Sequence, residues 1–446
     1  MGGRAVNPVT LTGGTVVSSL DPVELLAGNV AVEDGRVASI GAAPPGTATR
    51  DCSGCLVIPG NVCAHHHLYS SLARGMPYRL DPPRNFVETL RRLWWRLDRA
   101  LDDEAVWASA VVGGAVAILN GTTTVIDHHA SPNAVDGSLD LIASVQTDLG
   151  VRSVLCYEVS DRDGPDRADA GLEENRRFLK SEWPLSRGMV GAHASFTLSE
   201  ETLATCVDLA QSQGVGIHVH VAEDEADQRD AQIRFGKRVV ERLAAAGALD
   251  ERALLAHCVH VDEREREAIR SAGAWVVHNA TSNMNNSVGH APVRSFDRLA
   301  VGTDGVGGDM FAESKTAFWR AREIDPSIAP SWILARMADS ARVAAQAFGE
   351  PLLGRIEPGA PADLVVLAYD TPTPLSAENL AGHWAFGLGA RHVRDVMVGG
   401  EWSVLDRTLA RVDAAELTAR CREAATRLWE RLDHVAEHPF VPAGSS

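Results

Sequence analysis

Short runs of apolar, often β-branched residues recur along the chain from position 56 onward, and a stretch with helical spacing of apolar side chains follows each run. This alternation predicts repeated βα units. Strands are predicted at residues 56–64, 122–127, 152–159, 188–196, 215–221, 253–260, 274–279 and 299–303. They favour a (β/α)8 barrel, because an open doubly wound sheet would gather its polar residues at one switch point behind a Gly-rich loop.

The two ends of the chain have a different pattern. Residues 6–17 and 29–40 alternate in strand fashion with Gly at the turns, and residues 359–367 resume this pattern after the last predicted barrel strand. We expect strands of the two ends to pair into one β-sandwich. A final amphipathic helix is predicted at about residues 413–433, with its apolar side packed on the core.

A length of 446 residues suits a large barrel with one smaller domain. We expect a metal-dependent catalytic barrel at residues 58–349. Residues 1–57 and 350–446 would form a composite β-sandwich domain that includes the final helix. Thus the predicted fold class is α/β, a TIM-like barrel with a β-sandwich built from the flanks.

Charge and composition limit the partners. The formal net charge of -17 argues against nucleic acid, which requires a concentrated basic face. No apolar stretch reaches the ~20 residues of a membrane span, and the first residues lack an export signal. Seven cysteines, an odd number, are typical of reduced thiols. We therefore expect a cytoplasmic protein with a small-molecule substrate, no nucleic acid and no membrane partner, and a homo-oligomer, most simply a homodimer.

The first candidate site is a run of three histidines at the end of the first predicted strand. Side chains alternate along a strand, so His65 and His67 point to one side and can bind one metal ion, whereas His66 faces away. A histidine run alone also fits a surface cluster.

The second candidate site ends the fifth predicted strand. Alternation sends His218 and His220 to the same side, and Glu223 follows three residues after His220. A carboxylate beside a metal-activated water is suited to move a proton. The alternative for Glu223 is a solvated acid at the start of a helix.

Two more strand ends supply polar side chains. His257 ends the sixth predicted strand, and Asp304 ends the eighth. Together these strand ends offer three nitrogen ligands and one oxygen ligand, with a position left open for water. Such a set is typical of a catalytic metal site, since structural zinc sites are closed and rich in thiolates.

The order of these motifs resembles that of the amidohydrolase superfamily, in its deaminase and chlorohydrolase branch. The motifs are Pro-Gly-x4-His-x-His at 59–67, His-x-x-Glu at 220–223, His-Cys-x-His at 257–260, Ser-Asn-Met at 282–284 and Gly-Thr-Asp-Gly at 302–305. Four further segments are similar to SsnA-type aminohydrolases in particular. They are residues 67–76, 94–98, 121–132 and 156–164.

The resemblance implies a role for each candidate residue. The metal ligands would be His65, His67, His220 and Asp304, holding one divalent ion per chain, zinc or alternatively iron. Glu223 would take a proton from the bound water and protonate a ring nitrogen, Asp304 would pass the other proton to departing ammonia, and His257 would orient the attacking oxygen. His193 and Glu88 would contact the substrate.

A second metal ion is disfavoured. Two-metal members of this superfamily bridge their ions with a carboxylated lysine at the end of the fourth strand. The chain has only Lys180, Lys237 and Lys315, and none of them is there. A mononuclear site is therefore expected.

Several other polar and aromatic residues have weaker signals. His128 and Glu158 also end predicted strands, and we favour hydrogen bonds that support the ligands over direct contact with the substrate. Trp94 and Trp95 are read as a helical core pair rather than a stacking surface. Asparagines within residues 282–286 could bind a heterocycle or cap turns.

The leading hypothesis is deamination of an amino-substituted nitrogen heterocycle, purine- or pteridine-like, with release of ammonia. The rival is hydrolytic dechlorination, or opening of a cyclic amidine or amide, by the same site. A non-catalytic metal-bound sensor or scaffold is a third possibility, against which Glu223, His257 and Asp304 argue. The sequence leaves the substrate and its leaving group open.

Overall fold

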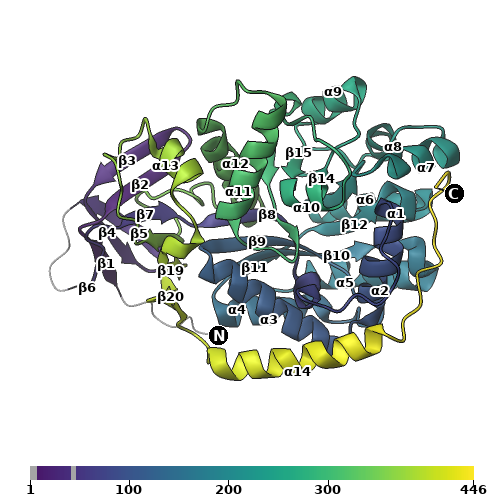
Figure 1. Cartoon of the computed structure of the whole chain (residues 1–446), viewed down its shortest axis with the longest axis horizontal. Coiled ribbons are helices and arrows are strands. Elements are labelled where there is room, and N and C mark those ends of the chain that lie inside the picture. Colours follow the sequence, from purple (N-terminus) through teal and green to yellow (C-terminus); the bar gives the residue numbers. More distant parts are fainter. Residues whose placement is uncertain (1–7, 42–46, 446) are drawn as a thin grey trace.

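The computed structural model describes residues 8–41 and 47–445, and a curled sheet of parallel strands with helices outside it forms its centre (Figure 1). Neighbouring strands pair in chain order, all in parallel. The strands are β8 (Asn61–His67), β9 (Thr122–His129), β10 (Arg152–Val159), β12 (Val190–Ala194), β13 (Ile217–Val221), β14 (Leu254–His257), β15 (Trp275–His278) and β16 (Leu299–Val301), with β11 (Ser186–Gly188) beside β10.

The last strand returns to the first. After β16 the chain passes through Gly302 and Thr303 into β17 (Asp304–Gly305), which pairs in parallel with β8. A Cβ at Gly302 would lie 2.6 Å from the backbone nitrogen of His65, so only glycine allows this close approach. The chain thus has a mixed α/β fold with a curled parallel sheet, consistent with a TIM-like barrel, as predicted.

Helices cover the outside of this sheet (Figure 1). Several begin at an Asp or Ser whose side chain accepts a hydrogen bond from a backbone N–H of the first turn, as at Asp102, Ser199 and Asp262. The helices that follow the strands are α3 (Asp103–Leu119), α4 (Ser138–Leu149), α5 (Pro165–Phe178), α6 (Glu200–Gln213), α7 (Glu225–Phe235), α8 (Val239–Ala245), α9 (Glu263–Ala272), α10 (Ala280–Asn285), α11 (Met310–Ile324) and α12 (Ser331–Phe348).

The first predicted strand, residues 56–64, is in fact two strands in two different sheets. β7 (Leu56–Pro59) pairs antiparallel with β18 (Leu364–Leu367), and β8 begins the curled sheet. Gly60 separates them, and a Cβ there would lie 2.0 Å from Oγ1 of Thr123. The apolar run continues through both strands, so the pattern of side chains alone did not reveal the break.

Two further sheets lie beside the curled sheet. One has the strand order β21-β20-β19-β18-β7-β2-β3 and the other the order β5-β4-β1-β6. An apolar cluster contains side chains of both, among them Val16, Val57, Leu11 and Val32. Their strands are β1 (Val9–Thr12), β2 (Thr15–Leu20), β3 (Val23–Ala27), β4 (Asn29–Glu33), β5 (Arg36–Gly41), β6 (Ala48–Asp51), β19 (Val393–Val398), β20 (Glu401–Leu405) and β21 (Thr408–Leu409). Val6, where a strand was predicted to start, lies outside the described residues.

The predicted final helix is α14 (Ala414–Leu432), capped by Asp413. Its buried residues Cys421, Ala424, Leu428 and Leu432 follow the predicted spacing. The helix packs on α3 and α2 (Trp95–Ala100), outside the curled sheet rather than on the flanking sheets (Figure 1). Shorter helices are α1 (Phe86–Thr89), a π-turn at Leu90–Trp94 and α13 (Leu380–Phe386). Within residues 8–41 and 47–445, no helix is both long and apolar enough to span a bilayer.

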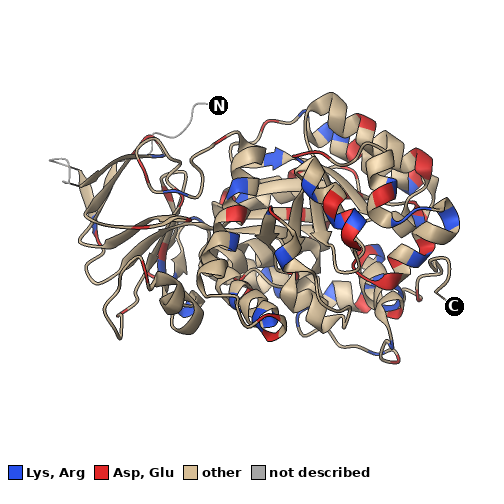
Figure 2. Ribbon diagram, turned by 90° about the horizontal axis from the view of Figure 1, so that it is seen from above, with Lys and Arg blue, Asp and Glu red and all other residues tan. Residues whose placement is uncertain are grey.

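Basic and acidic residues alternate on the outer helices, as Figure 2 shows. On α9, for example, Arg270 forms ion pairs with Glu263 and Glu267. In this view the charges of either sign are interspersed.

All seven cysteines lie in the described part of the chain, and all are free and buried. Burial raises the pKa of Cys52 to about 11 and that of Cys206 to about 12, so few thiolates exist near neutral pH. We expect less than one thiol per chain to react with a disulfide reagent within minutes in the native protein, and seven to react after denaturation. Rapid reaction of two or more native thiols would contradict the burial of these side chains.

Candidate active site

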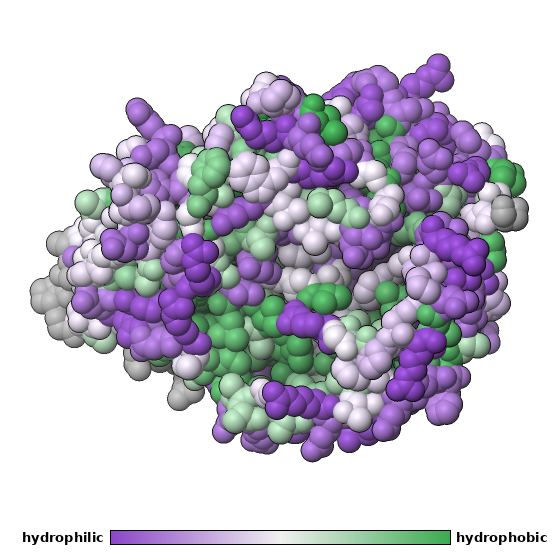
Figure 3. All heavy atoms as spheres, in the orientation of Figure 1, coloured by the Kyte–Doolittle hydropathy of each residue, from purple (hydrophilic) through white to green (hydrophobic). Residues whose placement is uncertain are grey.

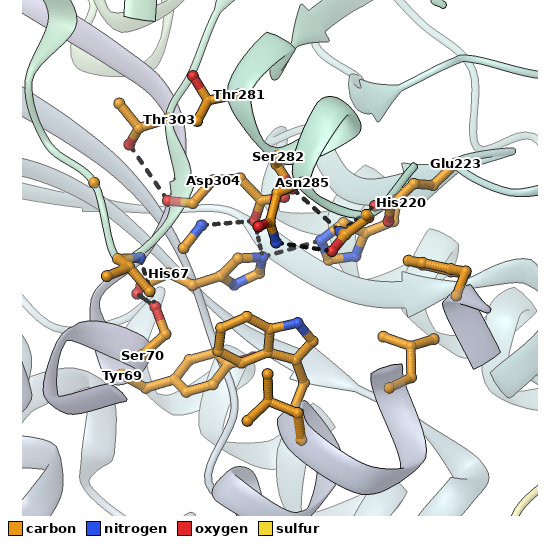
Figure 4. A pocket seen from close by; sticks show the side chains of 18 of the residues that line it. His67, Tyr69, Ser70, His220, Glu223, Thr281, Ser282, Asn285, Thr303 and Asp304 are labelled. Carbon is orange, nitrogen blue, oxygen red and sulfur yellow. Dashed lines mark hydrogen bonds and ion pairs between the residues drawn. The ribbon is translucent and has the colours of Figure 1, made fainter. Parts of the chain in front are cut away.

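The carboxyl ends of four parallel strands bring one aspartate and four histidines together. His65 and His67 end β8, His220 lies on β13, His257 ends β14 and Asp304 begins β17. Nε2 of His67 lies 3.1 Å from Nε2 of His220 and 3.1 Å from Oδ1 of Asp304, and Nε2 of His65 lies 3.6 Å from that oxygen. Figure 4 shows the side chains of His67, His220 and Asp304 directed toward one another.

In His65, His67 and His220, the Nδ1 atom, which points away from the centre of the cluster, already makes a hydrogen bond. Nδ1 of His67 donates to the carbonyl of His128 at 2.6 Å, and Nδ1 of His220 donates to that of His193 at 2.8 Å. Nδ1 of His65 pairs with Nε2 of His218, also at 2.8 Å. These bonds fix each ring and leave its Nε2 for the centre, as in known metal sites.

The donor set fits a divalent cation. Nε2 of His65 is buried without a hydrogen-bond partner among the described residues, and ligand atoms of His65, His67 and His220 lie within 4.8 Å of one another. Burial lowers the pKa of His65 to about 3, so its imidazole is neutral and free to bind a metal. Although burial acts in the opposite direction, the neighbouring imidazoles of His65 and His67 hold the pKa of Asp304 well below its usual value.

Glu223 lies across from this cluster, directly after β13. Its Oε1 accepts a hydrogen bond from Nδ2 of Asn286 at 3.1 Å, and its Oε2 lies 3.5 Å from Nε2 of His257. Nδ1 of His257 is 2.8 Å from Oδ1 of Asn283. Burial raises the pKa of Glu223 to about 7, a value at which a carboxyl group can both take up and release a proton.

Backbone strain is concentrated at the same strand ends. Ala222, His257, Cys258 and Asp304 have φ values of 46°, 72°, 49° and 57°. Positive φ is costly for non-glycine residues and persists where the surroundings enforce it, which is common at functional sites. Three of these residues are the predicted site residues His257 and Asp304 and the neighbour of Glu223.

The two residues expected to contact substrate are placed differently. His193 ends β12 and lines the cavity, with Nδ1 2.6 Å from Oγ1 of Thr197. Glu88 is on α1, where it accepts from the backbone of Arg84 at 2.8 Å and pairs with Arg92 at 3.0 Å. Glu88 is not among the described residues that line the cavity. The structure thus brings His193, but not Glu88, to the cluster.

The cavity has a volume of about 570 Å³ and one strongly aromatic wall. Tyr69, Phe86, Trp94 and Trp95 line it, all from the segment between β8 and β9. Trp95 is buried, as a core residue would be, yet it also faces the cavity. The sequence interpretation of a core pair was therefore incomplete, because burial beside a cavity and burial in a core produce the same apolar pattern.

A buried ion network supports this wall. Glu158 is 3.2 Å from Nδ1 of His128 and 2.5 Å from Nη1 of Arg162. Nη2 of Arg162 is 2.7 Å from Oδ2 of Asp98, a residue that sequence reasoning missed. Glu158 also lines the cavity. One of its carboxylate oxygens lies within 4.8 Å of an imidazole nitrogen of His193 and of one of His220. The supporting hydrogen bonds expected for His128 and Glu158 are present.

Replacing Arg162 by methionine is expected to destabilise the protein by about 3–5 kcal/mol, because buried Asp98 would lose the guanidinium that it pairs with and buried Glu158 would keep only its imidazole neighbours. Denaturant unfolding measures this change. Arg270→Met is the matched control, since Arg270 pairs with the exposed Glu263 and Glu267, and it should cost less than about 1 kcal/mol. If the two variants lost equal free energy of unfolding, the buried network would contribute no more to stability than the exposed ion pairs of Arg270.

Comparisons with known proteins show which family the chain resembles. The model of the amidohydrolase family matches residues 56–403. A 5-methylthioadenosine/S-adenosylhomocysteine deaminase of Nitratidesulfovibrio vulgaris is 32% identical over 424 residues, which are 91% of this chain and 94% of that protein. An 8-oxoguanine deaminase of Pseudomonas aeruginosa is 29% identical over 444 residues, 90% of this chain and 95% of that protein.

Among solved structures, a zinc-bound adenosine deaminase from Xanthomonas campestris superposes with a TM-score of 0.81. The match covers 94% of this chain and 98% of the other, at 24% sequence identity. At this identity the likeness establishes the fold and no more.

Proposed function

Because the chain belongs to the amidohydrolase family, we propose that it is a mononuclear metal-dependent hydrolase that deaminates an amino-substituted nitrogen heterocycle, purine- or pteridine-like, and releases ammonia. The observation that carries the proposal is the convergence of three imidazole nitrogens and one carboxylate, with Glu223 opposite them, in a cavity of the right size for a heterocycle. The similarity to proteins named as deaminases of purine compounds supports it.

In this proposal His65, His67, His220 and Asp304 hold one divalent ion, zinc or alternatively iron. When bound, such an ion acts as a Lewis acid that activates water for hydrolysis. No lysine lies in β12 or at its end, where two-metal members of the superfamily carry a bridging lysine, and this supports a single ion.

The proton steps are assigned to residues around the ion. Glu223 takes a proton from the water at Oε2 and delivers it to a ring nitrogen of the substrate. His257, held by Asn283, orients the attacking oxygen. Asp304 passes the second proton to the amino group, so that water and the amine yield a carbonyl product and ammonia. A binder without turnover would need no carboxyl group tuned in this way.

His193, which lines the cavity, contacts the substrate in this proposal. Glu88 could take part only if its side chain left Arg92 and turned inward. The rival chemistry, dechlorination or ring opening of a cyclic amidine or amide, would use the same ion and the same Glu223, and differs in the leaving group.

The test is a screen of metal-loaded enzyme against aminopurines, aminopterins, 5-methylthioadenosine and 8-oxoguanine, with ammonia detected directly. Ammonia from at least one compound is the expected result. Chloride released from a chlorinated heterocycle without ammonia from any compound would favour the rival. Elemental analysis should find about one metal ion per chain, and a reproducible count near two would contradict the mononuclear site.

We also propose the domain division expected from the sequence, with a (β/α)8 barrel at residues 58–349 and a second domain from residues 1–57 and 350–446, whose strands form the β-sandwich and whose final helix α14 packs back onto α2 and α3. The apolar cluster shared by the two flanking sheets supports the sandwich. Limited proteolysis tests the division, since cuts should fall between the two units before they fall within them.

A cytoplasmic homo-oligomer, most simply a homodimer, completes the proposal. The free thiols support a reducing compartment. Trp319 and Phe386 pack together at 5.4 Å although they are 45% and 71% exposed, and apolar side chains also gather in the lower half of the face in Figure 3. Such patches often mark interfaces. Light scattering should give about twice the 47.6 kDa of one chain.

A further inference from the structure

The wall of the cavity formed by α2 holds two polar atoms that the protein leaves unpaired. Trp95 and Asp98 lie one helical turn apart, both line the cavity, and they are only 2% and 1% exposed. Nε1 of Trp95 and Oδ1 of Asp98 are buried, and neither has a hydrogen-bond partner among the described residues. One atom is a donor and the other an acceptor.

Both side chains are held firmly in place. Oδ2 of Asp98 accepts from Arg162 at 2.7 Å, which fixes the carboxylate and leaves its other oxygen unused. The indole ring of Trp95 makes edge contacts with His438 at 5.2 Å and Phe440 at 5.8 Å. These two residues belong to the segment after α14, which runs past α2 in Figure 1.

Buried polar atoms without partners are rare in folded proteins, because each one loses its hydrogen bonds to water. Other described side chains also hold buried polar atoms without partners, but among the described residues that line the cavity only Trp95 and Asp98 do. The charges nearby favour a ligand that brings a polar hydrogen, since Asp98 and Glu158 share the single guanidinium of Arg162. Burial raises the pKa of Asp98 to about 8, and a ligand N–H donated to Oδ1 would stabilise its ionised form.

The wall is close to the proposed reaction centre. Arg162 links Asp98 to Glu158. A carboxylate oxygen of Glu158 lies within 4.8 Å of an imidazole nitrogen of His67 and of one of His220. A heterocycle whose amino group is near Glu223 and the metal ligands would thus extend its opposite end toward α2.

We infer that Trp95 and Asp98 form a recognition subsite for the end of the substrate remote from its amino group. Nε1–H of Trp95 donates to an oxygen or ring nitrogen, and Oδ1 of Asp98 accepts from an adjacent N–H or O–H. This inference rests on the proposed function. Two substrate groups share the required chemistry: the O=C–N–H edge of an oxopurine base and the neighbouring hydroxyls of a nucleoside ribose.

The experiment compares substrate pairs that differ in this group. 8-Oxoguanine is paired with guanine, and adenosine with 3′-deoxyadenosine, on metal-loaded wild type and Trp95→Phe. Only one of the two pairs needs to be deaminated for the test. In that pair, we expect Trp95→Phe to lower kcat/KM about 10- to 100-fold for 8-oxoguanine or adenosine, which carry the full recognition group. For guanine or 3′-deoxyadenosine, which lack part of it, kcat/KM should fall less than about 3-fold. Trp402→Phe is the matched control, since Trp402 packs on the apolar cluster of the flanking sheets and is not among the described residues that line the cavity, and it should change both by less than about 3-fold.

The pair that shows the effect identifies the source of the group, base or ribose. An equal loss on both members of the active pair, or no loss, would overturn the subsite while leaving deamination intact. Ammonia from other compounds of the wider screen but from none of these four would also overturn the subsite, whereas ammonia from no compound at all would overturn the proposed function. Calorimetric binding of the same pairs to Trp95→Phe and to Asp98→Asn, with folding of both checked by thermal melts, then decides whether the subsite exists.

Discussion

Replacing Glu223 by glutamine is expected to lower kcat/KM for the deaminated substrate by about 10²- to 10⁴-fold, the usual contribution of a general acid–base group. Glutamine has the same shape and can still accept the hydrogen bond from Asn286, but it cannot carry a proton from water to the ring. Metal content, measured by elemental analysis, should stay near one ion per chain because Glu223 is not among the proposed ligands.

Glu225→Gln provides the control for this variant. Glu225 begins α7 two residues further on, is exposed and pairs with Arg229 on the surface. Its replacement should leave kcat/KM within about 2-fold. Full activity of Glu223→Gln, or loss of its metal, would remove Glu223 from the proton steps.

Replacing His67 by alanine is expected to reduce the metal content from about one ion per chain to near zero and to lower activity by more than about 10³-fold. Nε2 of His67 lies 3.1 Å from Nε2 of His220 and from Oδ1 of Asp304. Its removal therefore takes away the ligand atom that lies between the other two. Loss even of residues that support a ligand typically costs 10- to 100-fold in affinity or activity, and loss of a ligand costs more. Elemental analysis after dialysis and the ammonia assay measure the two effects.

His66→Asn is the matched control for His67. The side chain of His66 faces the other way, with Nδ1 2.9 Å from Oγ1 of Thr303. This variant should retain its metal. A His67→Ala protein that still bound one ion with wild-type affinity would exclude His67 as a ligand.

Local periodicity allowed much of the fold to be predicted. The strand at residues 152–159 and the helix at about 413–433 agree with β10 and α14, because strand and helix repeats depend on side chains close in sequence. The predicted strands 188–196 and 253–260 extend beyond β12 and β14. There the backbone turns away at residues that still look apolar, such as Phe196 and Val259.

For the site, alternation along a strand predicted which side each histidine faces, but not how deep it lies. His218 and His220 both point inward as expected, yet His218 lies behind His65 and hydrogen-bonds to it at 2.8 Å, while His220 faces His67. The depth of a side chain depends on the stagger between neighbouring strands, and stagger is a property of the assembled sheet.

What the sequence determined by itself was therefore the set of strands, the end of each strand that carries the polar residues, and the residue types gathered there, since all of these follow from short-range pattern and residue chemistry. Only the tertiary structure decided that β7 leaves the curled sheet to pair with β18, and that Asp98 joins Arg162 across 64 positions of chain. Those outcomes depend on contacts between residues distant in sequence, for which no local pattern exists.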